Sequence, residues 1–260
     1  MVQFLVVQLV AYGPLCLWGG VGWRSLRGHG LRSLWVFFAL PFAVLAVMSG
    51  GGSSLPHWTA PAWVALAPFA GLGLARSFDA KGTQLGRWVI GILASLQLAA
   101  GLVLMGLMAS GGAPWLNPAP GTSTPVESPN PFADLHGWSD AGTRAIALAQ
   151  SRQLGSVAVQ NWTLASRLGW YARPLPVHVL EDRFDQFDLW AGDLPEGAST
   201  LLVDWSQMSY ETPLAPHGFA QCTLLETQPV VHWGHTLSSF RFYDCRQWSG
   251  TPQPRLRGER

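Results

Sequence analysis

Hydrophobic residues cluster strongly at the start of this chain. Four apolar runs fall at about 2–22, 33–49, 58–75 and 88–109. A helix needs about 20 apolar residues to cross the hydrocarbon core of a bilayer. Helices also satisfy their own backbone groups, which lipid does not do. The pattern therefore predicts about four transmembrane helices, which together form a helical membrane region over residues 1–110.

The pattern changes after residue 110. Residues 111–133 are rich in Pro, Gly, Ser and Thr, which predicts an extended connector. Residues 134–250 alternate short apolar runs with helical patterns, as is typical of βαβ units with a mostly parallel sheet, and residues 251–260 read as a disordered tail. The expected strands are 156–160, 177–180 and 200–205, and the expected helices are 162–171 and 139–152, the latter with Ser139 as N-cap.

The last part of this region predicts a β-hairpin. Two strand-like segments surround the sequence His-Trp-Gly-His at 232–235. A hairpin centred between Trp233 and Gly234 places Cys222 opposite Cys245, because both lie equally far from the centre. In an oxidising compartment this pair can form a cross-strand disulfide; the alternative is two unpaired thiols. The expected fold class is thus an α-helical integral membrane protein with about four transmembrane helices, followed by a small α/β soluble domain with a C-terminal β-hairpin.

Charge distribution sets the expected orientation. The first acidic residue is Asp79, and only 12% of the chain is charged. By the positive-inside rule the loops that carry basic residues are cytoplasmic, so everything after Ser110 lies outside. We therefore expect a multi-pass protein of the bacterial inner membrane, with its soluble domain in the periplasm. A signal peptide carries its positive charges before the apolar stretch, whereas here they follow it. No basic face for nucleic acid is evident. The cytoplasmic basic residues are Arg24, Arg27, Arg32, Arg76, Lys81 and Arg87.

Several motifs, taken in order, resemble those of GT-C membrane glycosyltransferases. That group includes the dolichyl-phosphate-mannose protein mannosyltransferases and the aminoarabinose transferases, glycosyltransferase families 39 and 83. The resemblance covers most of the chain and rests on the order of the motifs rather than on any single one. The motifs are Pro56-His57-Trp58-Thr59-Ala60-Pro61-Ala62-Trp63, Asp134-Leu135-His136-Gly137-Trp138, Asn161-Trp162-Thr163-Leu164-Ala165-Ser166 and Arg183-Phe184-Asp185-Gln186-Phe187-Asp188-Leu189-Trp190.

The resemblance implies transfer of a sugar from a polyprenyl-phosphate donor to a lipid, glycan or protein acceptor at the periplasmic face. In the family, the base and the metal-binding carboxylates sit on the first periplasmic loop, and this chain has no acid in its first 78 residues. The chain thus resembles the C-terminal portion of such an enzyme, expected to be inactive alone. A divalent cation and the catalytic residues would belong to the full-length enzyme; this segment has no identified catalytic residue and no expected cofactor or metal.

Candidate binding residues follow from the same motifs. His57 and Trp58 are candidates for the donor's lipid phosphate, and the alternative is an interfacial anchor that begins a helix. A second group after the strand 177–180 suits sugar or acceptor contact, with a solvated loop as the alternative. Its members are Arg183, Asp185, Gln186, Asp188 and Trp190. His232 and His235 lack a third nearby ligand and do not predict a metal site.

Two other functional readings stay open. The chain could be a non-catalytic membrane protein whose outer domain binds glycan or a partner subunit, with missing N-terminal helices or that subunit completing the assembly. It could also be a decayed gene without function. Membrane lipid is an expected partner in both protein readings, and whether the chain is an enzyme is left undecided by its sequence.

Overall fold

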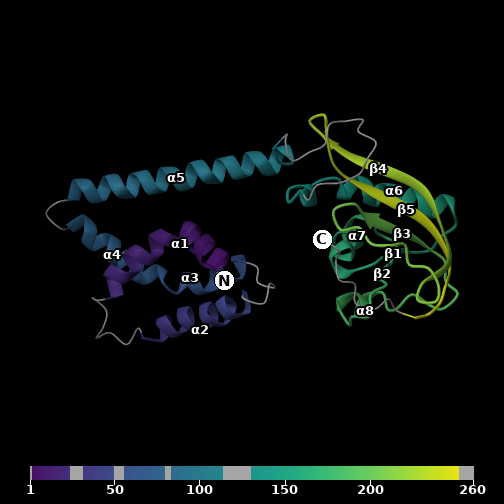
Figure 1. Ribbon diagram of the computed structural model, residues 1–260, viewed down its shortest axis with the longest axis horizontal. Helices are drawn as coiled ribbons and strands as arrows, with labels where there is room; N and C mark the ends of the chain where they lie inside the picture. The colour runs from purple at the N-terminus through teal and green to yellow at the C-terminus, as the bar shows by residue number, and fades with distance from the viewer. Residues whose placement is uncertain (1, 24–31, 50–55, 80–82, 114–129, 252–260) are drawn as a thin grey trace. The chain divides into compact units, whose positions relative to one another are not determined.

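The computed structural model describes residues 2–23, 32–49, 56–79, 83–113 and 130–251 (Figure 1). The chain divides into two compact units, Met1–Gly101 and Leu102–Arg260. Of the expected connector 111–133, most lies outside the described residues, as does the expected tail apart from its first residue.

Apolar helices of very different lengths make up the first unit. Proline residues stand at the beginning of its short helices, where a missing backbone N–H costs no hydrogen bond. The elements are α1 (Val2–Trp23), α2 (Arg32–Ser49), the 3-10 turn η1 (Pro56–Thr59), α3 (Ala60–Val64), α4 (Ala67–Asp79) and the first part of α5 (Thr83–Ser110).

Aromatic packing forms the core of this unit. Trp63 and Phe69 are buried, at 3% and 0% exposure. The Trp63 ring stacks on Tyr12 of α1 with centroids 4.8 Å apart, and its edge meets Phe42 of α2. One buried amide joins the same helices: Gln8 Oε1 accepts hydrogen bonds from the Thr59 hydroxyl at 2.6 Å and the Trp63 indole at 2.8 Å.

Two glycines bring α1 and α4 into backbone contact. A Cβ at Gly73 would lie 2.1 Å from the carbonyl oxygen of Trp18, and a Cβ at Gly22 would lie 1.8 Å from that of Phe69. Any side chain at either position would therefore push the helices apart. Small residues at a helix crossing allow this close approach.

The expectation of four membrane spans is wrong. Among the described residues, one helix is both long and apolar enough to cross a membrane, Arg87–Ser110. It corresponds to the expected span 88–109. The other three expected spans, 2–22, 33–49 and 58–75, do not meet both criteria among the described residues.

Length explains the difference for 33–49, and a break in the helix explains it for 58–75. The apolar part of α2, Ser33–Met48, has 16 residues, which gives about 24 Å at 1.5 Å per residue, short of the roughly 30 Å of hydrocarbon. The expected span 58–75 is not one helix, because the chain turns between α3 and α4. Pro68 lies in the first turn of α4. Because proline has no backbone N–H and its ring clashes with a preceding helical turn, α3 does not continue through this residue. α1 has several side chains outside the described set.

The second unit is an α/β domain. It contains the last residues of α5, the 3-10 turn η3 (Ala133–Leu135), α6 (Trp138–Ser151), β1 (Val157–Val159), α7 (Trp162–Tyr171), β2 (Val177–Val179), α8 (Gln186–Trp190), β3 (Thr200–Trp205), β4 (Phe219–His232) and β5 (His235–Trp248). The expected helix 162–171 and strand 200–205 have these same bounds. The expected N-cap Ser139 is wrong: it lies inside α6, whose N-cap is Gly137 at φ 82°.

The sheet is mixed, with strand order β2-β1-β3-β5-β4. β1 pairs in parallel with β2 and β3, whereas β5 runs antiparallel to both β3 and β4. The expectation of a mostly parallel sheet is therefore wrong, because β4 and β5 pair antiparallel. Helices connect the parallel strands β1, β2 and β3 in sequence, and the hairpin then extends the sheet on one side.

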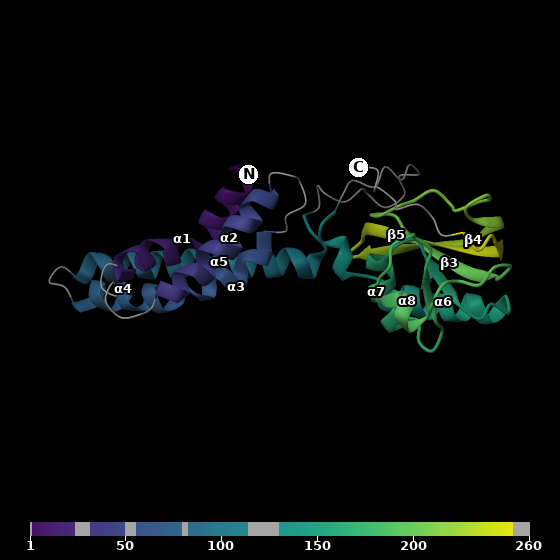
Figure 2. The ribbon, with the colours of Figure 1, turned by 90° about the horizontal axis from the view of Figure 1, so that it is seen from below.

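Helices cover one face of this sheet. Figure 2 shows α6 and α7 on the same side of the strands. Alanines of α6, such as Ala141 and Ala145, are fully buried and let the helix lie close to Val203 and Phe240. On the other face a smaller cluster, including Leu202, packs without a helix.

The hairpin β4–β5 is long and irregular. His232 pairs with His235, and Cys222 pairs with Cys245, whose Sγ atoms are bonded at 2.00 Å. The pairing register shifts twice, near Leu224 and near Val230. β4 is an outermost strand of the sheet, and it contains Pro229.

Candidate functional site

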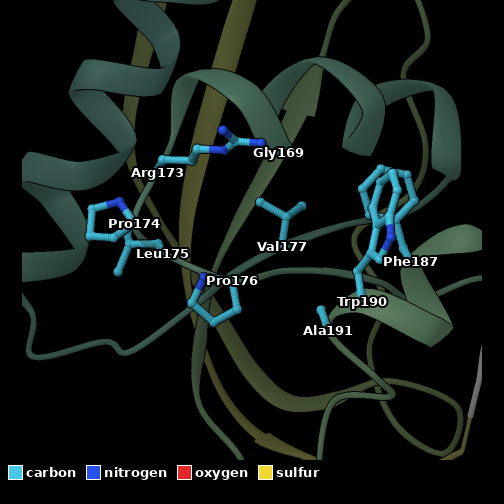
Figure 3. A pocket seen from close by; sticks show the side chains of 9 residues that line it. All are labelled: Gly169, Arg173, Pro174, Leu175, Pro176, Val177, Phe187, Trp190 and Ala191. Atoms are coloured by element: carbon cyan, nitrogen blue, oxygen red, sulfur yellow. The ribbon is translucent and has the colours of Figure 1, made fainter.

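A pocket of about 590 Å³ opens in the second unit between the end of α7, the beginning of β2 and the end of α8 (Figure 3). Its lining is mostly apolar and contains one cation and two aromatic rings. The lining residues are Gly169, Arg173, Pro174, Leu175, Pro176, Val177, Phe187, Trp190 and Ala191. In Figure 3, Arg173 and the two rings lie on opposite sides of Val177.

Local structure fixes the wall that carries Arg173. α7 begins at its N-cap Asn161, whose side chain accepts from the Leu164 backbone N–H, and it ends at Tyr171. The residues that follow, Pro174 to Pro176, have restricted φ angles and lead directly into β2. The guanidinium carbon of Arg173 lies 4.6 Å from the centroid of the Trp170 ring. This cation–π contact holds the charged group at the pocket's side.

The opposite wall is built from α8. Phe187 is buried in the main core, and its ring meets the Trp190 ring edge-on with centroids 5.3 Å apart. Gly169 leaves room for Phe187, because a Cβ there would lie 3.3 Å from the ring. Trp190 is 71% exposed. A rigidly backed indole that faces solvent is suited to stacking against a flat apolar surface of a ligand.

The two acids expected to contact sugar, Asp185 and Asp188, cap α8 in the structure. α8 begins with a capping box: the Asp185 side chain accepts from the Phe187 backbone N–H at 2.7 Å, and the Asp188 side chain accepts from the Asp185 backbone N–H at 2.5 Å. Such a box stabilises the first turn of a helix. The acids therefore position Trp190 indirectly, and neither lines the pocket.

The remaining members of the expected group are also separate from the pocket. Arg183 lies 5.9 Å from the centroid of the Trp162 ring, and Gln186 is exposed at the start of α8. Of the five residues expected to contact sugar or acceptor, Trp190 alone lines this cavity.

Sequence reasoning missed Arg173, Phe187 and the proline wall. The signal was present in the run Arg-Pro-Leu-Pro at 173–176, which is separated by Ala172 alone from a helix ending in Trp-Tyr. A cation and two prolines between a helix and an edge strand form a rigid and accessible corner. The resemblance drew attention instead to the motif at 183–190.

The two donor-phosphate candidates belong to the first unit. Trp58 is 50% exposed in the turn η1. His57 lies in the same turn, and its side chain is outside the described set. Among the described residues, no contact of Trp58 bears on the expected role of the pair.

A second polar cluster lies where β1 and β3 end. Asp204 is 2% exposed and pairs with Arg241 at 2.5 Å. Burial raises the pKa of Asp204 to about 6, and the pairing with Arg241 opposes that rise only in part. Burial also raises the pKa of the Tyr210 hydroxyl, which accepts a hydrogen bond from the Asn161 side-chain amide. These groups lie inside the domain, where Asp204 pairs with Arg241 and Tyr210 with Asn161.

Chemically, the pocket is suited to binding. Its lining has a guanidinium and apolar surface but no Asp, Glu or His to move a proton. Within the described ranges, no three His, Cys, Asp or Glu side chains gather as metal ligands would. His232 and His235 pair with each other at the hairpin turn. Comparison with known proteins finds no match among protein families, curated proteins or solved structures.

Proposed function

We propose that the second unit is a carbohydrate-binding domain and that the pocket beside α8 is its binding site. The observation that carries the proposal is the placement of Trp190, which is 71% exposed yet backed by Phe187, across a cavity from Arg173. An exposed indole presents an apolar face to the C–H groups of a sugar ring. The guanidinium donates hydrogen bonds to its oxygen atoms.

The charge of the lining favours an acidic sugar. Arg173 is the one charged residue that lines the pocket. A cation without a carboxylate partner in the lining favours a ligand that brings a negative charge, such as a uronic acid. The pocket volume of about 590 Å³ accommodates a short oligosaccharide.

Membrane attachment is part of the same proposal. Among the described residues, Arg87–Ser110 is the helix that meets the length and hydropathy needed for a span, and the carbohydrate-binding domain comes after it in the sequence. The Cys222–Cys245 disulfide supports an oxidising compartment, since such bonds are rare in the cytosol. We place the domain outside the cytoplasmic membrane, where it meets glycans.

Sugar transfer is a weaker candidate for this chain. It rests on the sequence motifs alone, and two of the acids in those motifs, Asp185 and Asp188, cap α8 in the structure. Binding of a lipid-linked sugar donor would use the same pocket. Binding without transfer is therefore the activity that the geometry supports best.

Calorimetric titration of the purified full chain in detergent tests the site. The probes are short oligomers of galacturonic acid and of galactose of equal length. We expect the acidic oligomer to bind more tightly. Trp190→Ala should weaken both, by roughly five-fold for the loss of about 1 kcal/mol of stacking. Arg173→Gln should weaken the acidic oligomer alone.

Two matched controls come from neighbouring residues. Phe184 is 78% exposed and Arg183 is a nearby cation, and neither lines the pocket. Phe184→Ala and Arg183→Gln should leave both affinities unchanged. If Trp190→Ala binds like the parent protein, or if both arginine variants lose the same affinity, the pocket is not the binding site.

A further inference from the structure

The tip of the hairpin β4–β5 carries an exposed aromatic residue at an unfavourable backbone position. Trp233 is 73% exposed and has φ 46°, and Gly234 follows with φ 78°. Together they form the two-residue turn between His232 and His235. Turns with two positive φ values favour Asn-Gly or Gly-Gly, because a bulky side chain strains this region. Folding alone therefore does not account for a tryptophan here.

Two histidines contact the end of α5: His232 from the hairpin and His136 from the turn before α6. His232 Nε2 lies 2.7 Å from the carbonyl oxygen of Ala109, and His136 Nε2 lies 2.9 Å from that of Met108. The last carbonyls of a helix have no partner four residues further along the helix, and these rings lie within hydrogen-bond distance of two of them. The two imidazoles lie against each other with centroids 4.6 Å apart.

The end of α5 is itself sharply defined. Gly111 has φ 75°, and the backbone N–H groups of Gly112 and Gly111 donate to the carbonyls of Leu107 and Met108. This is a Schellman motif, which stops a helix at a defined residue. The last residue of α5 is thus held at a fixed position relative to the hairpin tip.

The side chains of α5 near this end are apolar and open to the surroundings. Leu102, Val103, Leu104 and Met105 are each more than half exposed. Arg87–Ser110 has 24 residues, or about 36 Å of helix, which exceeds the roughly 30 Å of hydrocarbon. α5 carries an indole only near its other end, at Trp88.

The geometry points to the hairpin tip as a membrane-surface anchor: Trp233 inserts into the headgroup layer of the bilayer that α5 crosses, beside the point where α5 leaves it. The ring of His232 stacks on Trp233 with centroids 5.6 Å apart, so the same residue that binds the helix end also supports the indole. Val231, 56% exposed, adds apolar surface next to it. Indoles prefer this layer because one edge is apolar and the N–H is polar.

This anchor rests on the proposed membrane attachment through α5, and it is independent of sugar binding. Its consequence is that the α/β domain is held at the bilayer by two contacts rather than by one helix. A hairpin fixed in this way restricts rotation of the domain about α5.

Site-specific labelling of the full chain tests the anchor. Cys16, the free cysteine among the described residues, is first replaced by Ser. Trp233→Cys then receives an environment-sensitive NBD fluorophore, and the protein is reconstituted into liposomes of phosphatidylethanolamine and phosphatidylglycerol in equal amounts. Leu214→Cys is the matched control, because Leu214 is 53% exposed beside Phe219, at the opposite end of β4.

We expect the label at 233 to emit at shorter wavelength than the label at 214. We also expect quenching by nitroxide lipids labelled near the headgroup and a several-fold slower reaction with dithionite. Equal emission and equal dithionite rates at the two positions overturn the anchor. If alkaline carbonate releases the unlabelled parent protein from the liposomes, the membrane attachment itself fails, and the anchor fails with it.

Trp233→Asn separates anchoring from folding. Asn suits the positive φ better than Trp, so the thermal midpoint of this variant should equal or exceed that of the parent protein. A label at Val231→Cys should nevertheless lose its lipid quenching when Trp233→Asn is added. Unchanged quenching in that double variant would show that the indole does not hold the tip in the bilayer.

Discussion

The guanidinium of Arg241 lies 2.5 Å from the carboxylate of Asp204, which is buried at the end of β3. Burial raises the pKa of Asp204 from 3.8 to about 6 despite this contact. The pair therefore connects the stability of the domain to pH.

The direction of the pKa shift of Asp204 determines how the stability of the domain changes with pH. Because the folded pKa lies above the unfolded value, the folded state holds more protons between about pH 4 and pH 6. The stabilisation that Asp204 contributes is fully present below its pKa in the unfolded state. It is lost as the pH rises through its pKa in the folded state. A shift of this size corresponds to about 3 kcal/mol.

Asp204→Asn removes this titration. We expect the free energy of unfolding of the parent, relative to that of Asp204→Asn, to fall as the pH rises from about 4 to about 7. Denaturant unfolding at several pH values measures the difference. Asp182→Asn, at an exposed position, is the control and should show no comparable trend. A constant difference between the parent and Asp204→Asn would contradict the assignment.

The Cys222–Cys245 disulfide closes a loop across a sequence separation of 23. Loops of this length restrict the unfolded chain enough to stabilise the fold by about 3 kcal/mol. We therefore expect the double substitution Cys222→Ser and Cys245→Ser to lower the free energy of unfolding of the α/β domain by that order. Cys16→Ser should have little effect, and reductant should lower the stability of the parent but not that of the double variant.

Gly73→Ala tests the contact between α1 and α4. The added methyl group would lie 2.1 Å from the carbonyl oxygen of Trp18, so the helices must separate. We expect a loss of about 2 kcal/mol or more, as for other overpacked positions. Gly71→Ala is the matched control on the same helix, since a Cβ there meets nothing within 4 Å. Thermal unfolding in mild detergent should show a lower midpoint for Gly73→Ala alone.

Gln8→Leu tests the buried amide in the first unit. The substitution removes the oxygen that accepts from Thr59 and Trp63. Buried donors that lose an acceptor cost about 1–3 kcal/mol each. Thr59→Val removes one donor, and the double variant should therefore be less destabilised than the sum of the two single variants. Additive losses in this double-mutant cycle would show that the two side chains are not coupled.

Much of the α/β domain could be predicted from local sequence. The bounds of 162–171 and 200–205 were predictable because Asn161 is a strong N-cap and because β3 is buried along its whole length. The pairing of Cys222 with Cys245 followed from symmetry about the turn. The antiparallel position of β5 beside β3 is a long-range pairing, and hydrophobic periodicity does not encode it.

The first unit shows why hydropathy did not predict the number of membrane spans. Apolar composition alone does not distinguish a lipid-facing helix from one that packs against its neighbours. Trp63 and Phe69 lie within the expected span 58–75, yet they form a protein core.

Asp185 and Asp188 resembled ligand contacts because carboxylates near an aromatic residue suit a sugar. Their capping role depends on a five-residue helix that the sequence pattern did not predict.

The outer edge of β4 has a consequence for how copies of the domain meet. A 14-residue strand with a free edge is usually a template on which another chain can add a strand. Here Pro229 offers no N–H, and the two register shifts bend the strand away from a straight ladder. An incoming strand could match this edge only over short stretches. Molecules crowded on one surface can thus keep their sheets apart without covering that edge.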